Sequence, residues 1–416
     1  MYDLLIKNGR VGNEYGVQEL DVAVKDEKIV ALTTTGQLSD DSASKVIDAT
    51  GKYVLPGGID SHVHYDLSIS EAMSAQSAEA GSRAGLWGGT TTYIDFSMAA
   101  GEESLISSIE GKLEHTAAQN PHSDYAMHAI MSGDWPLHNG DEIADAISGG
   151  VVSFKFFTAF KGSPTIGGLM SDDGRIYQAM LATEKHGGIT MVHCEDECII
   201  DYNIRRLYAD GRPEFWNIGE ALHPNLVFGP ELYKQENGQR YMNYPPNKPI
   251  EHREALWAAC AEGRVHTLAS DDFTIPLERK LAGDTVDNVT GGTNSVETRM
   301  AIFWSEGVAK GKLSVEKFVD LTAAGPAKLF GIYGTKGVLR PGADADVIVM
   351  DPDVEHTFRQ GENLHSDCDY SNWDGWKVKG FPVTTILRGN VMVDDGRWVG
   401  PQGIGKFVPG RTPQAV

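Results

Sequence analysis

Three short apolar runs, each introduced by a pair of glycines, constrain the fold of this chain more than any other feature. Gly88-Gly89 precede TTTYIDF, Gly149-Gly150 precede VVSFKFF, and Gly187-Gly188 precede ITMVHC. A glycine in the left-handed conformation commonly ends a helix, and runs of this length are too short to be the next helix. Because they are apolar at nearly every position, they are typical of parallel strands that helices cover on both faces.

Further strand-like runs extend this pattern along the middle of the chain. They are GGIDSHVH, DYAMHAIM and RVHTLASDD. A long alternation of strands and helices favours a single (β/α) barrel over two unrelated domains. The expected fold class is therefore α/β, with a TIM-like barrel over residues 56–337.

Both ends of the chain differ in character from the middle. Residues 1–55 contain DLLIKNGRV, LDVAVKDEKIVAL and KVIDATGKYVL, and residues 338–395 contain GVLRPGADADVIVMDPD and TTILRGNVMVDDGRWV. Short runs separated by turn residues predict antiparallel strands. We therefore expect one small β-sandwich domain built from both termini, followed by a tail over residues 396–416.

The charge balance and the absence of targeting signals limit the partners and the location. The chain has 58 acidic and 36 basic residues and a formal net charge of −22. That leaves too little positive charge to neutralise a phosphate backbone, so we expect no nucleic-acid partner. The N-terminus lacks the features of a signal peptide, and no segment has the roughly 18 apolar residues of a membrane span. With four scattered cysteines, typical of reduced thiols, these features predict a cytoplasmic protein with no membrane partner.

The run GIDSHVH ends in two histidines, His62 and His64. Residues two apart on a strand point to the same face, so the two imidazoles could hold one metal ion. The alternative is a pair of ordinary surface histidines at a strand end. The spacing alone leaves these two interpretations balanced.

Polar residues also occupy three other strand-like runs. Lys155 lies within VVSFKFF, where an unpaired ammonium would be costly to bury, so it must be paired with an acid, neutral or chemically altered. A neutral lysine amine can add carbon dioxide to become a carbamate. His193 closes ITMVHC, and Asp271 closes RVHTLASDD. Because barrels of this kind carry their active sites at the C-terminal strand ends, these positions together favour a metal-dependent catalytic site.

Several motifs resemble the dihydropyrimidinase and hydantoinase group of amidohydrolases. They are PGGIDSHVH, GGTTTYIDF, SFKFF, MVHCED, GADADVIVMDPD and DYSNWDGWKVKGFPVTTILRGNVMV. The resemblance covers nearly the whole chain. It implies an enzyme that opens a cyclic amide, such as a hydantoin or a dihydropyrimidine-like ring, and a homotetramer or homodimer.

The resemblance also implies a role for each candidate residue. His62, His64 and Asp271 resemble the ligands of a first divalent metal ion, usually zinc. Lys155 resembles a carboxylated lysine that bridges two ions, and His193 resembles a ligand of the second. In the implied mechanism, a hydroxide held between the ions attacks the ring carbonyl. Asp271 accepts its proton and passes it to the leaving amide nitrogen.

The chain departs from the family pattern between His193 and Asp271. The family places another strand there, which supplies a second histidine to the second metal, whereas here GRPEFWN runs directly into IGEALHPNLVF. We therefore expect one strand–helix unit to be absent. His223 is the candidate substitute ligand, and a barrel without the unit must close with seven strands or leave a gap.

Three single positions also differ from the family pattern. Phe160 replaces a tyrosine that helps to stabilise the oxyanion, Tyr244 replaces a serine before the Pro-Pro pair, and Asp272 replaces a histidine after the catalytic aspartate. These differences leave open a second class of function, a catalytically silent relative or deletion form retained as an oligomeric interaction protein. The five candidate ligands favour the enzyme, because a silent protein has no need of them. Whether one or two ions bind remains open.

Overall fold

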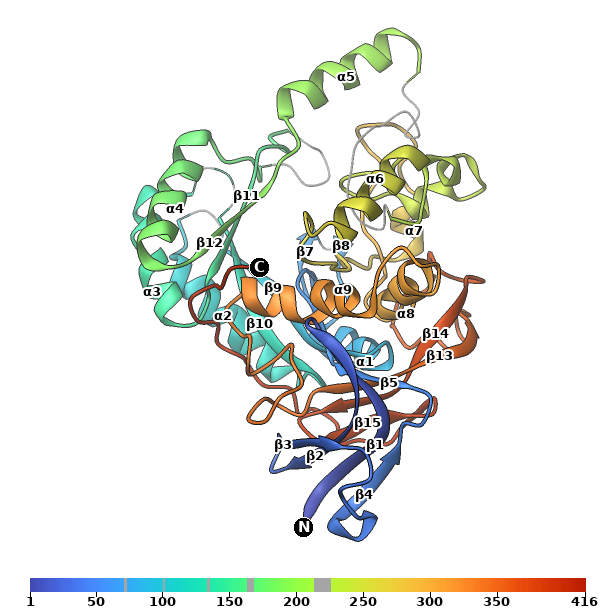
Figure 1. The fold of residues 1–416 in the computed structure, drawn as a ribbon. Helices are drawn as coiled ribbons and strands as arrows, with labels where there is room; N and C mark the ends of the chain where they lie inside the picture. The colour runs from blue at the N-terminus through green and yellow to red at the C-terminus, as the bar shows by residue number, and fades with distance from the viewer. Residues whose placement is uncertain (71–72, 100–101, 132, 134, 163–167, 213–225) are drawn as a thin grey trace.

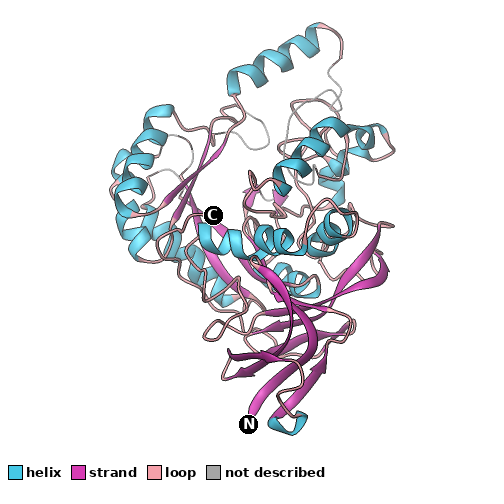
Figure 2. Cartoon of the chain, in the orientation of Figure 1, coloured by secondary structure: helices cyan, strands magenta, loops and turns pink. Residues whose placement is uncertain are grey.

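The computed structural model describes residues 1–416 apart from 71–72, 100–101, 132, 134, 163–167 and 213–225 (Figure 1). The described chain contains a nine-stranded sheet, a five-stranded sheet and a two-stranded sheet. Figure 2 shows most of the strands of the nine-stranded sheet near the N-terminus, at one end of the molecule, whereas the helices surround the five-stranded sheet.

The nine-stranded sheet joins the two ends of the chain. Its strands are β1 (Tyr2–Asn13), β2 (Gly16–Lys25), β3 (Lys28–Thr34), β4 (Ala43–Asp48), β5 (Tyr53–Pro56), β13 (Val347–Thr357), β14 (Lys377–Leu387), β15 (Asn390–Asp394) and β16 (Arg397–Trp398). The link is β5, because it pairs in parallel with β1 and antiparallel with β13. The expected β-rich unit from both termini is confirmed, and the exact domain limits remain predictions.

The five-stranded sheet is parallel throughout and has the order β12-β11-β10-β9-β6. Its strands are β6 (Gly58–Asp60), β9 (Thr90–Met98), β10 (Asp124–Ile130), β11 (Ser153–Phe157) and β12 (Ile189–His193). The connections contain α1 (Ala78–Trp87), α2 (Leu105–Ala118), α3 (Ile143–Ser148) and α4 (Asp173–His186). This alternation confirms the expected TIM-like α/β fold.

The glycine pairs act as the sequence predicts. Gly89, Gly150 and Gly187 have positive φ angles of 86°, 93° and 80°. Each follows a helix closely, in a conformation that a residue with a Cβ atom seldom adopts, and leads into β9, β11 or β12. Because these strands start from one edge of the sheet, their carboxyl ends meet at the other edge, where the candidate site lies.

The remaining elements lie in connections or after β12. They are η1 (Asp40–Ser42), β7 (Ser68–Ser70), β8 (Met73–Ser74), η2 (Leu137–Gly140), α5 (Glu197–Ala209), η4 (Pro230–Lys234), η5 (Gly238–Tyr241), α6 (Ile250–Ala261), α7 (Leu277–Lys280), α8 (Arg299–Phe303), η6 (Trp304–Val308), α9 (Val315–Val319), η7 (Asp320–Ala324) and α10 (Gly325–Leu329).

The parallel sheet stops at β12. Between His193 and Asp271, the described residues form α5, η4, η5 and α6 but no strand. In keeping with this, every residue of β12 is only partly buried, whereas nearly all of β9 and all of β10 and β11 are buried. The expected absence of a strand–helix unit stays a prediction, because part of this stretch, residues 213–225, lies outside the described residues. Glu220 and His223 lie outside them.

The expected strand over RVHTLASDD is wrong. In this segment only Asp272 forms strand-like bridges, one of them to Val63 after β6. Earlier in the segment, the Leu268 amide donates to a carbonyl of η7, and the Leu268 carbonyl accepts a hydrogen bond from the Arg299 guanidinium at 2.8 Å. A helix and a side chain thus satisfy backbone groups that a neighbouring strand would otherwise bind.

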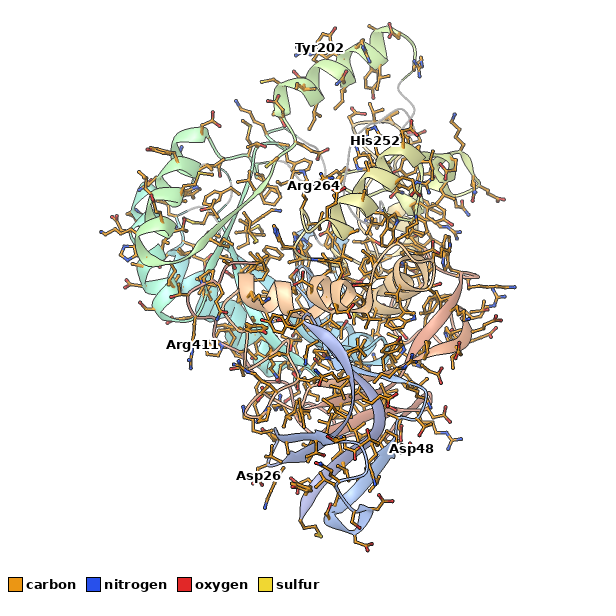
Figure 3. The ribbon with its side chains drawn as sticks, in the orientation of Figure 1. Asp26, Asp48, Tyr202, His252, Arg264 and Arg411 are labelled. Atoms are coloured by element: carbon orange, nitrogen blue, oxygen red, sulfur yellow. The ribbon has the colours of Figure 1, made fainter. Side chains whose placement is uncertain are left out.

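Helix α5 lies apart from the rest of the chain (Figure 1). Leu207 is its one buried residue, whereas Ile199 and Tyr202 are each 61% exposed. Figure 3 shows Tyr202 on this outlying helix. The apolar side chains of α5 therefore find little cover within the described part of the chain.

The four cysteines are free thiols, and two of them, Cys194 and Cys198, are exposed. Among the described helices, none combines the length and the apolar character that crossing a membrane requires.

A buried ion cluster ties the two large sheets together. Lys336 Nζ lies 2.5 Å from Asp124, 2.9 Å from Asp344 and 2.7 Å from Asp346, and Arg388 also pairs with Asp124. Asp124 begins β10, whereas Asp346 immediately precedes β13. The three carboxylates are close enough to hold a cation, and the Lys336 ammonium already fills that role. The cluster is therefore a set of ion pairs that joins the central and terminal sheets.

Replacing Lys336 with methionine should strongly destabilise the fold. The substitution would leave the buried Asp346 without its described ion pair and would remove one partner from Asp124 and Asp344, which costs about 3–5 kcal/mol. Urea unfolding should show that loss, whereas the control Lys28→Met, which removes a lysine with a 45% exposed side chain from Asp344, should cost about 1 kcal/mol or less. Equal losses in the two variants would contradict the assigned role of Lys336.

Candidate metal centre

Three predicted ligands meet at the carboxyl edge of the central sheet. His62 Nε2 lies 3.2 Å from His64 Nε2 and 3.2 Å from Asp271 Oδ1, and His64 Nε2 lies 3.3 Å from the same oxygen. All three residues are half-buried. Imidazole nitrogens and a carboxylate oxygen are common zinc ligands. This donor set therefore fits a single divalent metal ion.

The protonation states of the cluster also suit a metal ion. Burial lowers the pKa of His62 well below its ordinary value, so its imidazole is neutral near neutral pH. Burial alone would raise the pKa of Asp271, but His62 and a hydrogen bond with His64 hold it well below its usual range. A neutral imidazole and an ionised carboxylate are the forms that bind metals.

The two histidines are held in place just beyond β6. Between them, the Val63 amide donates to the Ile94 carbonyl of β9 at 3.2 Å, and the His64 amide donates to the Asp272 carbonyl at 2.8 Å. The Phe96 ring lies 4.6 Å from the His62 ring and 4.7 Å from the His64 ring. These contacts keep the chain extended and bring both imidazoles to one side, as the HxH spacing predicts.

Asp271 is positioned by a buried ion pair rather than by a strand. Its φ angle of 51° lies in the left-handed region, which aspartate tolerates better than most residues. The preceding Ser270 amide donates to Asp60 Oδ1 at 2.9 Å, and Asp60 Oδ2 lies 3.3 Å from Arg299 Nε. Both ion-pair side chains are fully buried. Arg299 thus ties the Asp271 segment to the end of β6.

Asp272, the residue that replaces a family histidine, has a structural role. Its carboxylate accepts hydrogen bonds from the amides of Ser295 and Val296 and from the side chain of Gln76. Burial raises its pKa to about 7, with a further contribution from Asp60. Burial is therefore the main cause of the raised pKa of Asp272.

Lys155 is buried in the middle of β11, and no described carboxylate lies within ion-pair distance of its Nζ. The centroid of the Phe157 ring lies 5.1 Å from Nζ. Burial lowers the pKa of Lys155, against the attraction of Asp271. A neutral or chemically altered Lys155 therefore stays a prediction.

His193 ends β12 as predicted, but it lies outside the group formed by His62, His64 and Asp271. Its Nε2 instead lies 2.6 Å from Glu195 Oε2. The sequence analysis did not single out Glu195. The HxE spacing in MVHCED could have indicated it, because residues two apart in an extended chain share a face, as in HxH.

The rings of Phe160 and Tyr244, the other two departures, lie together, and Phe160 also lies beside His193. The Phe160 ring is 5.0 Å from the His193 ring and 5.7 Å from the Tyr244 ring. Phe160 also has a φ angle of 71°, an unusual conformation for a bulky residue. The Tyr244 hydroxyl donates to the Val289 carbonyl. Two aromatic rings thus occupy this part of the site, and Phe160 has no hydroxyl to offer an oxyanion.

The fold and the ligand cluster define the class of protein. The chain belongs to the amidohydrolase family, whose sequence profile matches residues 53–392.

Within that family the similarity to hydantoinases extends over the whole chain. The chain is 31% identical to a D-hydantoinase of Geobacillus stearothermophilus, and the alignment covers 97% of this chain and 96% of that protein. The crystal structure of dihydropyrimidinase from Brevibacillus agri NCHU1002 superimposes with a TM-score of 0.91 at 28% identity, covering 100% of both chains. A D-hydantoinase crystal structure gives 0.90 at 29% identity, covering 99% of both. The resemblance inferred from the sequence motifs is confirmed.

Replacing Arg299 with lysine should loosen the attachment of the Asp271 segment. Lysine keeps the positive charge opposite Asp60 but lacks the guanidinium group, whose other two nitrogens donate to the Leu268 carbonyl and the Thr90 hydroxyl. We expect thermal or urea unfolding to show a loss of about 2–3 kcal/mol, typical of a charge-assisted hydrogen bond.

The matched control is Arg264→Lys, at a side chain that is 65% exposed and paired with Glu262. It should change the stability by no more than about 0.5 kcal/mol. A similar small effect for Arg299→Lys would show that the buried ion pair does not hold this segment.

Proposed function

We propose that this protein is a metal-dependent hydrolase that opens a cyclic amide, with a hydantoin or a dihydropyrimidine-like ring as the substrate class. The observation that carries the proposal is the convergence of His62, His64 and Asp271, which places three ligand atoms within 3.3 Å of one another at the strand ends. The names of the hydantoinase and dihydropyrimidinase relatives support the choice of substrate.

In this proposal His62, His64 and Asp271 hold the first divalent ion, for which zinc is the expected metal. A bound divalent ion lowers the pKa of water and polarises a carbonyl group. Asp271 has a second role, because its ionised carboxylate can accept the proton of the attacking water and deliver it to the leaving amide nitrogen. The neutral His62 imidazole cannot compete for that proton as readily, since burial disfavours its charged form.

Lys155 and His193 complete the proposed centre. Lys155 is carboxylated, since burial favours the neutral amine that reacts with carbon dioxide, and no described acid pairs with it. The carbamate would act as a ligand between two ions. His193, at the end of the neighbouring strand, would contribute an imidazole to the second ion.

The alternative is a catalytically silent amidohydrolase relative, or a deletion form, that acts as an oligomeric interaction protein. Two observations favour it. Phe160 cannot donate a hydrogen bond to an oxyanion, and a donor of that kind is worth on the order of 100-fold in rate. In addition, the described residues between β12 and Asp271 contain no strand that could supply another histidine.

We also propose that the chain assembles as a homodimer or homotetramer in the cytoplasm. Helices α4 and α5 carry exposed apolar side chains, which supports a contact between copies. On α4 these are Tyr177, Met180 and Leu181, at 62%, 44% and 48% exposed, and on α5 they include Ile199 and Tyr202.

The proposed activity predicts ring opening that depends on Asp271. Protein incubated with zinc and bicarbonate should open hydantoin or dihydrouracil, which chromatography of the ring-opened product would detect. Asp271→Asn should reduce kcat/KM by about 100-fold to 10,000-fold, because it removes the proton carrier and a metal ligand. The exposed control Asp201→Asn should keep wild-type activity. Wild-type protein that opens none of a panel of cyclic amides would favour the silent alternative.

The proposed modification of Lys155 is open to direct observation. Protein exchanged into isotope-labelled bicarbonate and zinc should show one carbamate resonance in its carbon NMR spectrum. Lys155→Gln should abolish that resonance. The control is Lys310→Gln, which changes an exposed lysine paired with Glu306 and should leave the resonance unchanged. A spectrum without a carbamate signal in the zinc-loaded wild type would remove Lys155 from the proposed ligands.

A further inference from the structure

A second pair of ligand-type side chains lies at the end of β12. His193 Nε2 lies 2.6 Å from Glu195 Oε2, and the two side chains are 10% and 19% exposed. They are two positions apart, so their HxE spacing repeats at β12 the HxH spacing that brings His62 and His64 together after β6. At the first centre, too, an imidazole nitrogen faces a carboxylate oxygen.

Thr158 fixes the backbone that carries this pair. It follows β11 directly, and its amide donates to the His193 carbonyl at 3.0 Å. Its hydroxyl lies within hydrogen-bond distance of two carbonyls, that of His193 at 2.9 Å and that of Glu195 at 2.7 Å. The Glu195 side chain thus starts from a backbone position that β11 determines, although it lies beyond the last residue of β12.

The pair faces the same side of the sheet as Lys155. In the parallel register of β11 and β12, Phe157 lies beside His193 and Lys155 lies beside Met191. Lys155 and Phe157 are two apart and share a face. The Phe157 ring contacts both neighbours, with its centroid 5.1 Å from Lys155 Nζ and 5.6 Å from the His193 ring centroid. Lys155 and His193 therefore contact one aromatic ring, and Glu195 lies beside His193.

We propose that Glu195 is a direct ligand of the second metal ion, in the place of the histidine that the absent strand would have supplied. The second site would then consist of His193, Glu195 and the carboxylated Lys155. Carboxylate oxygen and imidazole nitrogen are both common zinc ligands, so the substitution keeps a suitable donor set. This inference rests on the proposed function, because it concerns the second ion of the same centre.

Glu195 could instead accept a hydrogen bond from His193 and only orient that ring. The two roles differ in magnitude. Losing a carboxylate that orients a metal-binding histidine weakens metal affinity by about 10-fold to 100-fold. Losing a direct ligand from a site with three protein ligands should weaken binding of the ion by more than the upper limit of that orienting effect, about 100-fold.

Zinc titration of bicarbonate-equilibrated protein tests the proposal. We expect two ions per wild-type chain and one per Glu195→Ala chain, with the second Kd raised more than about 100-fold and the first unchanged. Glu195→His should restore the second ion, because it supplies another ligand. The exposed neighbour Asp196 is the control, and Asp196→Ala should bind two ions. A Glu195→Ala chain that keeps two ions, or weakens the second by 100-fold or less, would overturn the proposal.

Cobalt provides a readout of direct bonding. In a Cys194→Ala, Cys198→Ala background, Glu195→Cys should produce a thiolate-to-cobalt charge-transfer band as the second equivalent of Co²⁺ is added. Asp196→Cys in the same background should produce none. Absence of the band from the Glu195→Cys protein would overturn the assignment of residue 195 as a ligand.

These results separate the inference from the function on which it rests. A wild-type chain that binds no zinc would contradict the proposed function and the inference together. A wild-type chain with two ions and ring-opening activity, whose Glu195→Ala variant also keeps two ions, would contradict the inference alone. In that case His223→Ala would show whether His223 supplies the missing ligand.

Discussion

The metal centre depends on a buried ion pair. Asp271 lies on a segment that forms almost no strand hydrogen bonds, and the fully buried pair of Asp60 and Arg299 fixes that segment to the end of β6. The same β6 leads directly into His62 and His64. One ion pair therefore sets the position of the aspartate relative to the two histidines, and the central sheet sets the position of the ion pair.

The two edges of the central sheet differ in the described part of the chain. The edge formed by β6 keeps its cluster of ligands, whereas β12 is only partly buried and α5 beyond it is largely exposed. Near that edge, the Phe160 ring lies between His193 and Tyr244 and contacts both of their rings. A cyclic amide bound there would meet apolar surface where the family pattern places hydroxyl groups, so its ring substituents should differ from those of a typical dihydropyrimidine.

Local sequence signals predicted much of this fold and part of the site. Left-handed glycines such as Gly187 marked where helices end, and the HxH spacing placed His62 beside His64, because both follow from the geometry of a single strand or turn. The predicted strand before Asp271 did not form, because an apolar run becomes a strand only when a neighbouring strand pairs with it. Whether such a neighbour exists is decided by another part of the sequence and cannot be read from the run itself. Glu195 was missed because its significance depends on what the fold places beside it.

We propose that His62, His64 and Asp271 together hold one divalent metal ion. Anomalous diffraction at the zinc edge, from crystals grown with zinc and bicarbonate, tests this assignment. We expect an anomalous peak within about 2.0–2.2 Å of all three ligand atoms. Well-diffracting crystals with no peak between these side chains would contradict it and leave a fold that keeps the ligands without the metal.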